Sequence, residues 1–286
     1  MKVEACSAEA GIGAVVSGID MAVPQPAEIF DTLREALFQH HVLVFHGQRL
    51  TPQAQYRFAC GLGEAEPPEP GRSLACAFPA VPAIQRLSFI RSDGTAPTDL
   101  RPSQGDSWHT DYAYLPDPPE LAFLCAVELP EEGPETWYLD MQAAYRALPE
   151  SRKREIAGLR ALHTQKGGLD PTRFQLPPYL RPGEPDDGSA DRGTTHPLVR
   201  AHPATGRKSL YMAQCYTTGI EGWGAADGRE LVDDLYRMAL ATGGIYRHVW
   251  RPGDCLIWDN RSTNHRRSKP MTRPRVMHRV AIALRR

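Results

Sequence analysis

The amino-acid sequence predicts a mostly β fold, a sandwich or barrel with helices packed outside it. Proline (26 residues) and glycine (24 residues) are both abundant, which favours short elements joined by many turns. Segments with strand-like composition are short and recur along the chain, whereas helical spacing is confined to a few intervals near the start and between strands. This alternation is typical of an antiparallel β architecture with peripheral helices.

The first third of the chain contains the clearest helix signals. Residues 27–40 carry apolar side chains at helical spacing, and the β-branched run 42–45 that follows is typical of a buried strand. Thr51 as N-cap and Pro52 at the first helical position begin a second helix, which Gly63 ends. A strand is expected at 11–19, and polar loops are expected at 65–80 and 91–107.

The rest of the chain reads as short strands and three helices. The segment Pro203-Ala204-Thr205-Gly206 between two apolar runs predicts a hairpin. Residues 166–195 are dominated by glycine, proline, aspartate and arginine, so we expect a long loop that acts as a lid. The remaining expected elements are strands at 81–90, 121–129, 196–201, 208–212, 254–258 and 275–284, with a basic loop joining the last two, and helices at 141–148, 151–159 and 228–241.

Composition excludes several classes of protein. The chain has 286 residues, 41% of them hydrophobic, and neither a repeat nor a linker, so we expect one globular domain over 1–286. The formal net charge of -1 argues against a broad nucleic-acid surface. The N-terminus lacks the apolar run of a signal peptide, and no segment is apolar enough to cross a membrane. The six cysteines form no C-x-x-C pair, so we expect them reduced and mostly buried, in the cytoplasm.

One short motif points to a metal. His109 and Asp111 are separated by one residue, and alternate residues of a strand face the same side, so both could reach one ion. With 10 histidines and 34 acidic residues, such a pair is expected by chance about once, so the motif alone is weak. His265 would complete two histidines and one carboxylate, a set that suits non-haem Fe(II). Zinc could use the same three groups, which leaves a zinc hydrolase as an alternative.

Longer motifs around these residues make the interpretation specific. They occur in a fixed order, and together they resemble the TauD/TfdA family of taurine- and phenoxyacetate-type dioxygenases from about residue 11 to the C-terminus. The matching segments are W-H-T-D (108–111), E-L-P-x-x-G-x-x-T (128–136), H-P-L-V-R-x-H-P-x-T-G-R-K (196–208), W-D-N-R-x-T-x-H (258–265) and R-V-M-H-R (275–279), preceded by an entry strand in 42–50.

The resemblance implies a double-stranded β-helix, which is a jelly-roll, cupin-like barrel with helices outside. It implies that His109, Asp111 and His265 hold Fe(II) at the mouth of the barrel. The expected reaction uses O2 to convert 2-oxoglutarate to succinate and carbon dioxide while a C–H bond of a small organic substrate is oxidised, most simply by hydroxylation. A desaturating or cyclising member of the same family is an alternative outcome.

The resemblance also implies roles for three further residues. Arg275 and Thr136 match the arginine and threonine that bind 2-oxoglutarate, and a guanidinium meets a carboxylate through two parallel hydrogen bonds. Arg279 matches the arginine that binds the acidic group of taurine. The histidine that helps to bind sulfonate has no counterpart in 66–70, and Gly105 stands where a polar residue is expected, so taurine is disfavoured. A carboxylate, an amino-acid-like molecule or a specialised metabolite is expected instead.

Other conspicuous residues are expected to be structural. A non-catalytic barrel without metal is a further alternative, which the intact set of three ligands disfavours. We expect a small-molecule substrate as the only partner class, without nucleic acid or membrane, and the oligomeric state, a homo-oligomer included, is left open. Phe174, Tyr179 and Leu180 are expected as walls of the substrate pocket. Structural roles are expected for Trp258, Asp259, Asn260, His196, His202 and His278.

Overall fold

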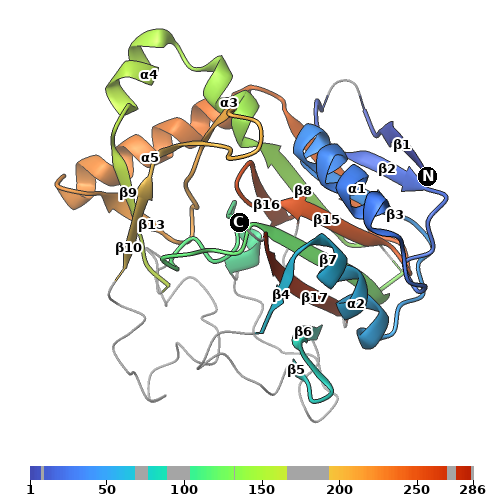
Figure 1. The fold of residues 1–286 in the computed structure, drawn as a ribbon. Coiled ribbons are helices and arrows are strands. Elements are labelled where there is room, and N and C mark those ends of the chain that lie inside the picture. The colour runs from blue at the N-terminus through green and yellow to red at the C-terminus, as the bar shows by residue number, and fades with distance from the viewer. Residues whose placement is uncertain are drawn as a thin grey trace.

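The computed structural model describes residues 1–7, 10–67, 77–88, 104–131, 133–165, 193–268 and 275–284. Strands predominate among them, as the sequence predicts, and Figure 1 shows the helices on the outside. Most of the expected lid, residues 166–192 with its three pocket-wall candidates, lies outside the described residues. No helix in the described part of the chain is long and apolar enough to span a bilayer.

A large sheet forms the centre of the molecule. Its strands run in the order β1-β2-β3-β15-β7-β17-β6-β5, and β4 pairs with the far end of β17. Neighbours in this order come from distant parts of the sequence, since β15 pairs antiparallel with both β3 and β7. The strands are β1 (Lys2–Ala5), β2 (Ala14–Ser17), β3 (Val42–Phe45), β4 (Glu64–Glu66), β5 (Ala77–Phe78), β6 (Val81–Ser88), β7 (Leu121–Glu128), β15 (Cys255–Asp259) and β17 (Val276–Ala283).

Two helices cover one face of this sheet (Figure 1). Helix α1 (Ala27–His40) and helix α2 (Pro52–Leu62) have the bounds that the sequence predicts. Phe30 and Phe58 from the helices pack edge to face, and Phe58 also contacts Phe123 of β7. The predicted cap is confirmed, because the Thr51 hydroxyl accepts a hydrogen bond from the Ala54 amide at 3.2 Å. The helices therefore seal the sheet with an apolar core.

We expect Thr51→Ala to lower the free energy of unfolding by about 1 kcal/mol, because an orphan amide at the start of α2 loses its acceptor. Thr32→Ala is the matched control. The Thr32 hydroxyl donates only to the Glu28 carbonyl within the exposed face of α1, so its loss is expected to be nearly neutral. Urea titration of both variants measures the difference, and equal stabilities would contradict the capping role.

A second, smaller sheet faces the first and carries part of the site. It has the order β14-β8-β16, with β8 (Glu135–Asp140) in the middle and β14 (Ile245–Val249) and β16 (Thr263–Arg267) antiparallel on either side. The side chains of Thr136, Tyr138 and Asp140 alternate with the others along β8 and are buried. This sheet therefore presents one face of polar and aromatic groups to the interior.

A third region packs at the end of the two sheets. The predicted hairpin is confirmed, since β11 and β12 pair antiparallel on either side of the turn. In Figure 1 the long helix α5 lies beside α3. The small sheet β10-β9-β13 lies on the same side of the molecule as these helices. These elements are α3 (Met141–Ala147), α4 (Glu150–Ile156), β9 (Arg160–His163), β10 (Thr194–Pro197), β11 (Val199–Ala201), β12 (Lys208–Leu210), β13 (Thr217–Ile220) and α5 (Ala225–Ala241).

Three sequence predictions of local structure are wrong. The stretch expected as a basic loop between the last two strands contains β16, and the loop predicted at 65–80 contains most of β4 and all of β5. Strand β16 has the polar sequence TNHRR, so it lacks the apolar alternation by which strands are recognised. Its conformation is fixed by hydrogen bonding to β8 along its whole length. The third error concerns residues 109–111, which form a single bridge and a turn rather than a strand.

The expectation that all cysteines are reduced is also wrong at one pair. Cys125 on β7 and Cys255 on β15 are register partners with Cα atoms 4.2 Å apart, and they form a disulfide. They are 130 positions apart in the sequence, so only the order of strands makes them neighbours. Among the other described cysteines, Cys215 is buried, Cys6 is partly buried and Cys60 is exposed.

Candidate metal centre

A pair of backbone hydrogen bonds brings the two predicted histidine ligands together. The His109 amide donates to the His265 carbonyl at 3.0 Å, and the His265 amide donates to the His109 carbonyl at 2.7 Å. This isolated antiparallel bridge joins the W-H-T-D segment to β16 and sets the two imidazole rings 4.2 Å apart between centroids. The histidines are thus neighbours because of the fold, although most of the chain separates them.

Asp111 reaches the same point from a turn instead of a strand. The hydroxyl of Thr110 donates to the Asn260 carbonyl at 2.6 Å, which ties the segment to the end of β15. Tyr112 then adopts a positive φ of 59°, a conformation rarely found outside glycine and asparagine. This turn, and not strand alternation, directs the Asp111 carboxylate towards the histidines.

The three side chains form a compact, buried cluster. Their ligand atoms all lie within 4.8 Å of one another, and none of the three residues is more than 9% exposed. The Asp111 Oδ1 atom lies 3.9 Å from His109 Nε2 and 4.0 Å from His265 Nε2. Nitrogen and oxygen ligands bind first-row metals at about 2.0–2.2 Å, so one cation among these atoms is within reach of all three after small adjustments.

The protonation states of the histidines suit metal binding. Burial lowers the pKa of His109, and the His109 Nδ1 atom lies 2.8 Å from the Ser107 carbonyl. The N–H on Nδ1 donates to this carbonyl, which leaves the Nε2 lone pair directed at the cluster. Burial, followed by the neighbouring His109, lowers the pKa of His265 to about 3. Both imidazoles are therefore neutral at pH 7, as metal ligands must be. The donor set fits a divalent iron.

The residues predicted to bind 2-oxoglutarate lie beside this cluster. Arg275 directly precedes β17, and burial followed by the charge of Arg267 lowers its pKa to about 9. Thr136 is buried on β8 and is the register partner of Arg267 on β16. The Thr136 hydroxyl oxygen accepts from Trp250 Nε1 at 2.9 Å, so its own proton is available to another acceptor.

Sequence reasoning missed two charged residues at this end of the site. Arg267 is nearly buried and forms an ion pair with Asp106 at 3.0 Å. A Cβ atom on Gly105 would lie 3.2 Å from the Arg267 guanidinium, so the absence of a side chain at Gly105 makes room for this cation. The sequence did show that Gly105 stands where the family has a polar residue. It did not show that the Arg267 guanidinium occupies the space beside this glycine.

Arg279 on β17 contacts the metal cluster at Asp111. Its Nη1 atom lies 3.2 Å from Asp111 Oδ1, and it also donates to the Tyr112 hydroxyl and to Gln85 Oε1. The Tyr112, Tyr114 and Tyr216 rings pack in sequence next to it, and Tyr216 contacts the His109 ring edge to face. The predicted substrate arginine is therefore adjacent to the metal ligands, within an aromatic surrounding.

The residues expected to be structural have structural contacts. Trp258 is 1% exposed and packs against the His265 ring at 4.8 Å between centroids. Asp259 accepts from the Arg261 amide at 2.9 Å, and so supports the turn after β15. His202 donates from Nε2 to Asp259 Oδ2 at 2.8 Å, because its Nδ1 atom faces two backbone amides. His196 Nε2 lies 2.9 Å from the Leu115 carbonyl.

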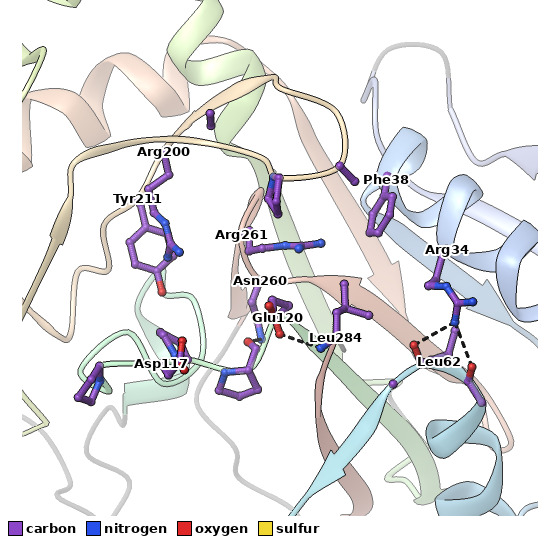
Figure 2. Close-up of a pocket in the computed structure, with 18 of the residues that line it drawn as sticks. Arg34, Phe38, Leu62, Asp117, Glu120, Arg200, Tyr211, Asn260, Arg261 and Leu284 are labelled. Carbon is purple, nitrogen blue, oxygen red and sulfur yellow. Dashed lines mark hydrogen bonds between the residues drawn. The ribbon is translucent and has the colours of Figure 1, made fainter. Parts of the chain in front are cut away.

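A cavity of about 810 Å³ lies apart from the metal ligands, which do not line it (Figure 2). Arg34 on its wall donates to the Gly61 and Leu62 carbonyls, as the dashed lines in Figure 2 show. Arg261, which also lines the cavity, is paired with Asp259. None of the predicted site residues within the described ranges lines this cavity, so the His109 cluster and not the cavity is the candidate site for chemistry.

Comparison with known proteins identifies the class that this fold and site define. Pentalenolactone F synthase of Streptomyces arenae is 32% identical over 264 residues, 90% of this chain and 86% of that one. The α-ketoglutarate-dependent 2,4-dichlorophenoxyacetate dioxygenase of Burkholderia sp. (strain RASC) is 33% identical over 84% of this chain and 80% of its own. The crystal structure of AAD-2 with Mn(II) and N-oxalylglycine superposes with a TM-score of 0.84 at 27% identity, covering 100% of this chain and 99% of that chain. The protein is therefore an α-ketoglutarate-dependent dioxygenase with a jelly-roll fold.

The family assignment follows from the match over nearly the whole chain. The model of the family described as taurine catabolism dioxygenase TauD, TfdA family matches residues 4–281. The chain belongs to this family, whose enzymes act on small organic substrates with Fe(II), 2-oxoglutarate and O2. Family membership excludes the zinc-hydrolase alternative that the three ligands alone left open.

Proposed function

We propose that His109, Asp111 and His265 hold the iron, that Arg275 and Thr136 bind the distal carboxylate of 2-oxoglutarate, and that Arg279 binds the primary substrate. The observation that supports this proposal most strongly is the buried cluster of two neutral histidines and one carboxylate, with ligand atoms within 4.8 Å. Two histidines and a carboxylate on one face leave the remaining coordination positions open for co-substrate and O2.

Iron with 2-oxoglutarate supplies the oxidising chemistry once both are bound. The protein's own residues bind, orient and exclude water. Arg275 is a partly buried cation that has lost much of its contact with water, and a carboxylate that pairs with it would replace that lost interaction. The Thr136 hydroxyl is held by Trp250, so it is already oriented to donate. The ring of Trp258 packs against His265 and fixes this ligand in place.

We propose a small carboxylate as the primary substrate and hydroxylation as its reaction. Arg279 is a fork-shaped donor beside the metal ligands, and this geometry suits a carboxylate. The tyrosines at 112, 114 and 216 provide apolar rings next to it for the body of the substrate. Two relatives point in the same direction, since they are named for 2,4-dichlorophenoxyacetate and (S)-phenoxypropionate, which are aryloxy carboxylates.

Succinate formation tests the proposed reaction. Protein prepared without oxygen is given Fe(II), 2-oxoglutarate and air, and succinate is quantified with and without a panel of small carboxylates. We expect succinate to depend on both iron and 2-oxoglutarate, and to rise with an accepted substrate. If no succinate forms with any acid, and no visible iron-to-2-oxoglutarate charge-transfer band appears in the anaerobic protein, the proposal is wrong.

The two arginines are expected to affect different ligands. Arg275→Gln should raise the KM for 2-oxoglutarate by about 10- to 100-fold, because a charged hydrogen-bonded pair is lost. Arg279→Gln should remove the stimulation of succinate formation by the primary substrate, measured with Fe(II) in excess because Arg279 also contacts the proposed ligand Asp111. Steady-state kinetics with each ligand varied separately measures both effects. If Arg279→Gln instead raised the KM for 2-oxoglutarate and Arg275→Gln removed only the stimulation by substrate, the roles proposed for the two arginines would be exchanged.

A further inference from the structure

Tyr138 is a fully buried tyrosine beside the proposed metal ligand His265. Tyr138 occupies the middle of β8, where it is the register partner of His265 on one side and Tyr246 on the other. The three rings form a ladder, with nearly parallel planes (25° between Tyr138 and each neighbour) and centroid separations of 6.0 and 6.2 Å. Tyr138 therefore lies next to a metal ligand, with its ring position fixed from both sides.

The strand also aligns Tyr138 with the co-substrate residues. Thr136 lies two positions earlier on β8, so both side chains are on the same face of the sheet. Arg275 is close enough to Tyr138 to affect its pKa, and so is Asp111. Tyr138 thus shares one face of β8 with Thr136, stacks on the ring of His265, and lies within electrostatic range of both Asp111 and Arg275.

The Tyr138 hydroxyl has no hydrogen-bond partner among the described residues, although the residue is 0% exposed. Buried hydroxyls are almost always paired, because an unpaired one loses its bonds to water without replacement. The neighbouring Tyr246 follows this rule, with its hydroxyl 3.1 Å from His248 Nδ1. Burial raises the pKa of Tyr138 well above its usual range, so the hydroxyl keeps its proton and remains a donor.

We propose that the Tyr138 hydroxyl donates a hydrogen bond to the distal carboxylate of 2-oxoglutarate, as a third group beside Arg275 and Thr136. The proposal rests on the proposed function, because it uses the same co-substrate site. It accounts for a hydroxyl at the centre of the aromatic ladder, where phenylalanine would preserve the ring contacts. With Arg275, Thr136 and Tyr138 together, the pocket would favour 2-oxo diacids over 2-oxo monoacids more strongly than it would with Arg275 and Thr136 alone.

Anaerobic binding of two acids to the Fe(II) protein tests this role. The variant Tyr138→Phe retains the ring and removes the hydroxyl. We expect it to bind 2-oxoglutarate about tenfold more weakly than wild type, from titration of the charge-transfer band. Binding of 2-oxovalerate, which has the same chain length without the distal carboxylate, should be unchanged. Tyr246→Phe is the matched control, expected to bind both acids like wild type.

Thermal unfolding of the co-substrate-free variants separates binding from folding. Tyr138→Phe removes an unpaired buried hydroxyl, so its Tm should equal or exceed that of wild type. A lower Tm, an equal loss of affinity for both acids, or unaltered affinity for 2-oxoglutarate would each overturn the role of Tyr138. If the wild-type protein itself binds neither acid, the proposed co-substrate site is wrong. That result is distinct from weaker binding that is seen only in the Tyr138→Phe variant.

Discussion

The variant His109→Ala is expected to lose iron binding and iron-dependent succinate formation. His109 is one of the three proposed ligands, and the described residues group no fourth histidine, cysteine or carboxylate with them that could take its place. Even residues that merely orient a ligand cost about 10- to 100-fold in metal affinity when replaced, so loss of a ligand should reduce it by at least 100-fold. Iron content after anaerobic loading and desalting, together with succinate yield, measures the effect.

A histidine elsewhere provides the control for this variant. His40 lies in the last turn of α1, outside the metal cluster, and is partly exposed. The variant His40→Ala should retain iron and succinate formation at wild-type levels. If His109→Ala binds iron as tightly as His40→Ala does, His109 is not a ligand, and the assignment of the whole cluster fails with it.

Loss of the Asp259 carboxylate is expected to cause the largest loss of stability. Asp259 is 0% exposed and accepts hydrogen bonds from the Arg261 side chain, the Arg261 amide and His202. The variant Asp259→Ala would leave the buried Arg261 cation without its counter-ion, which should lower the free energy of unfolding by about 3–5 kcal/mol. Urea unfolding measures the difference in the free energy of unfolding.

The control for Asp259→Ala is an acidic residue with an exposed ion pair. Asp31 pairs with Arg34 on α1, and the Asp31 side chain is 67% exposed. The variant Asp31→Ala should change the free energy of unfolding by less than about 1 kcal/mol, because water solvates both partners. Similar losses in the two variants would mean that burial does not set the strength of the Asp259 pair.

The same aspartate gives stability a defined pH dependence. Burial by itself raises the pKa of Asp259, but the Arg261 charge and the hydrogen bonds from His202 and Arg261 reverse this and hold the pKa well below its usual range. A depressed pKa stabilises the folded state at pH values above the unfolded pKa of about 4. This contribution is lost as the pH falls below about 4, and the Asp259→Ala variant should lack that part of the acid-dependent decline.

Much of the fold was predictable because its signals are local. Helices α1 and α2 begin and end where the apolar spacing, Thr51 and Gly63 indicate, and the hairpin between β11 and β12 follows from its turn residues. The order of the W-H-T-D, W-D-N-R and R-V-M-H-R motifs determined the family without any structure. These features depend on residues close together in the sequence, which is why the sequence alone determined them.

Only the tertiary structure decided how the site is assembled. Strand β16 exists because it pairs with β8, and its polar residues face inward where the site needs them. The bridge between His109 and His265, the hydrogen bond from Thr110 to Asn260 and the ion pair of Arg267 with Asp106 all join segments far apart in the chain. That the Tyr138 hydroxyl has no partner within the described parts of the chain could be recognised only after its surroundings were known. Such features result from long-range packing, for which a single sequence contains no local signal.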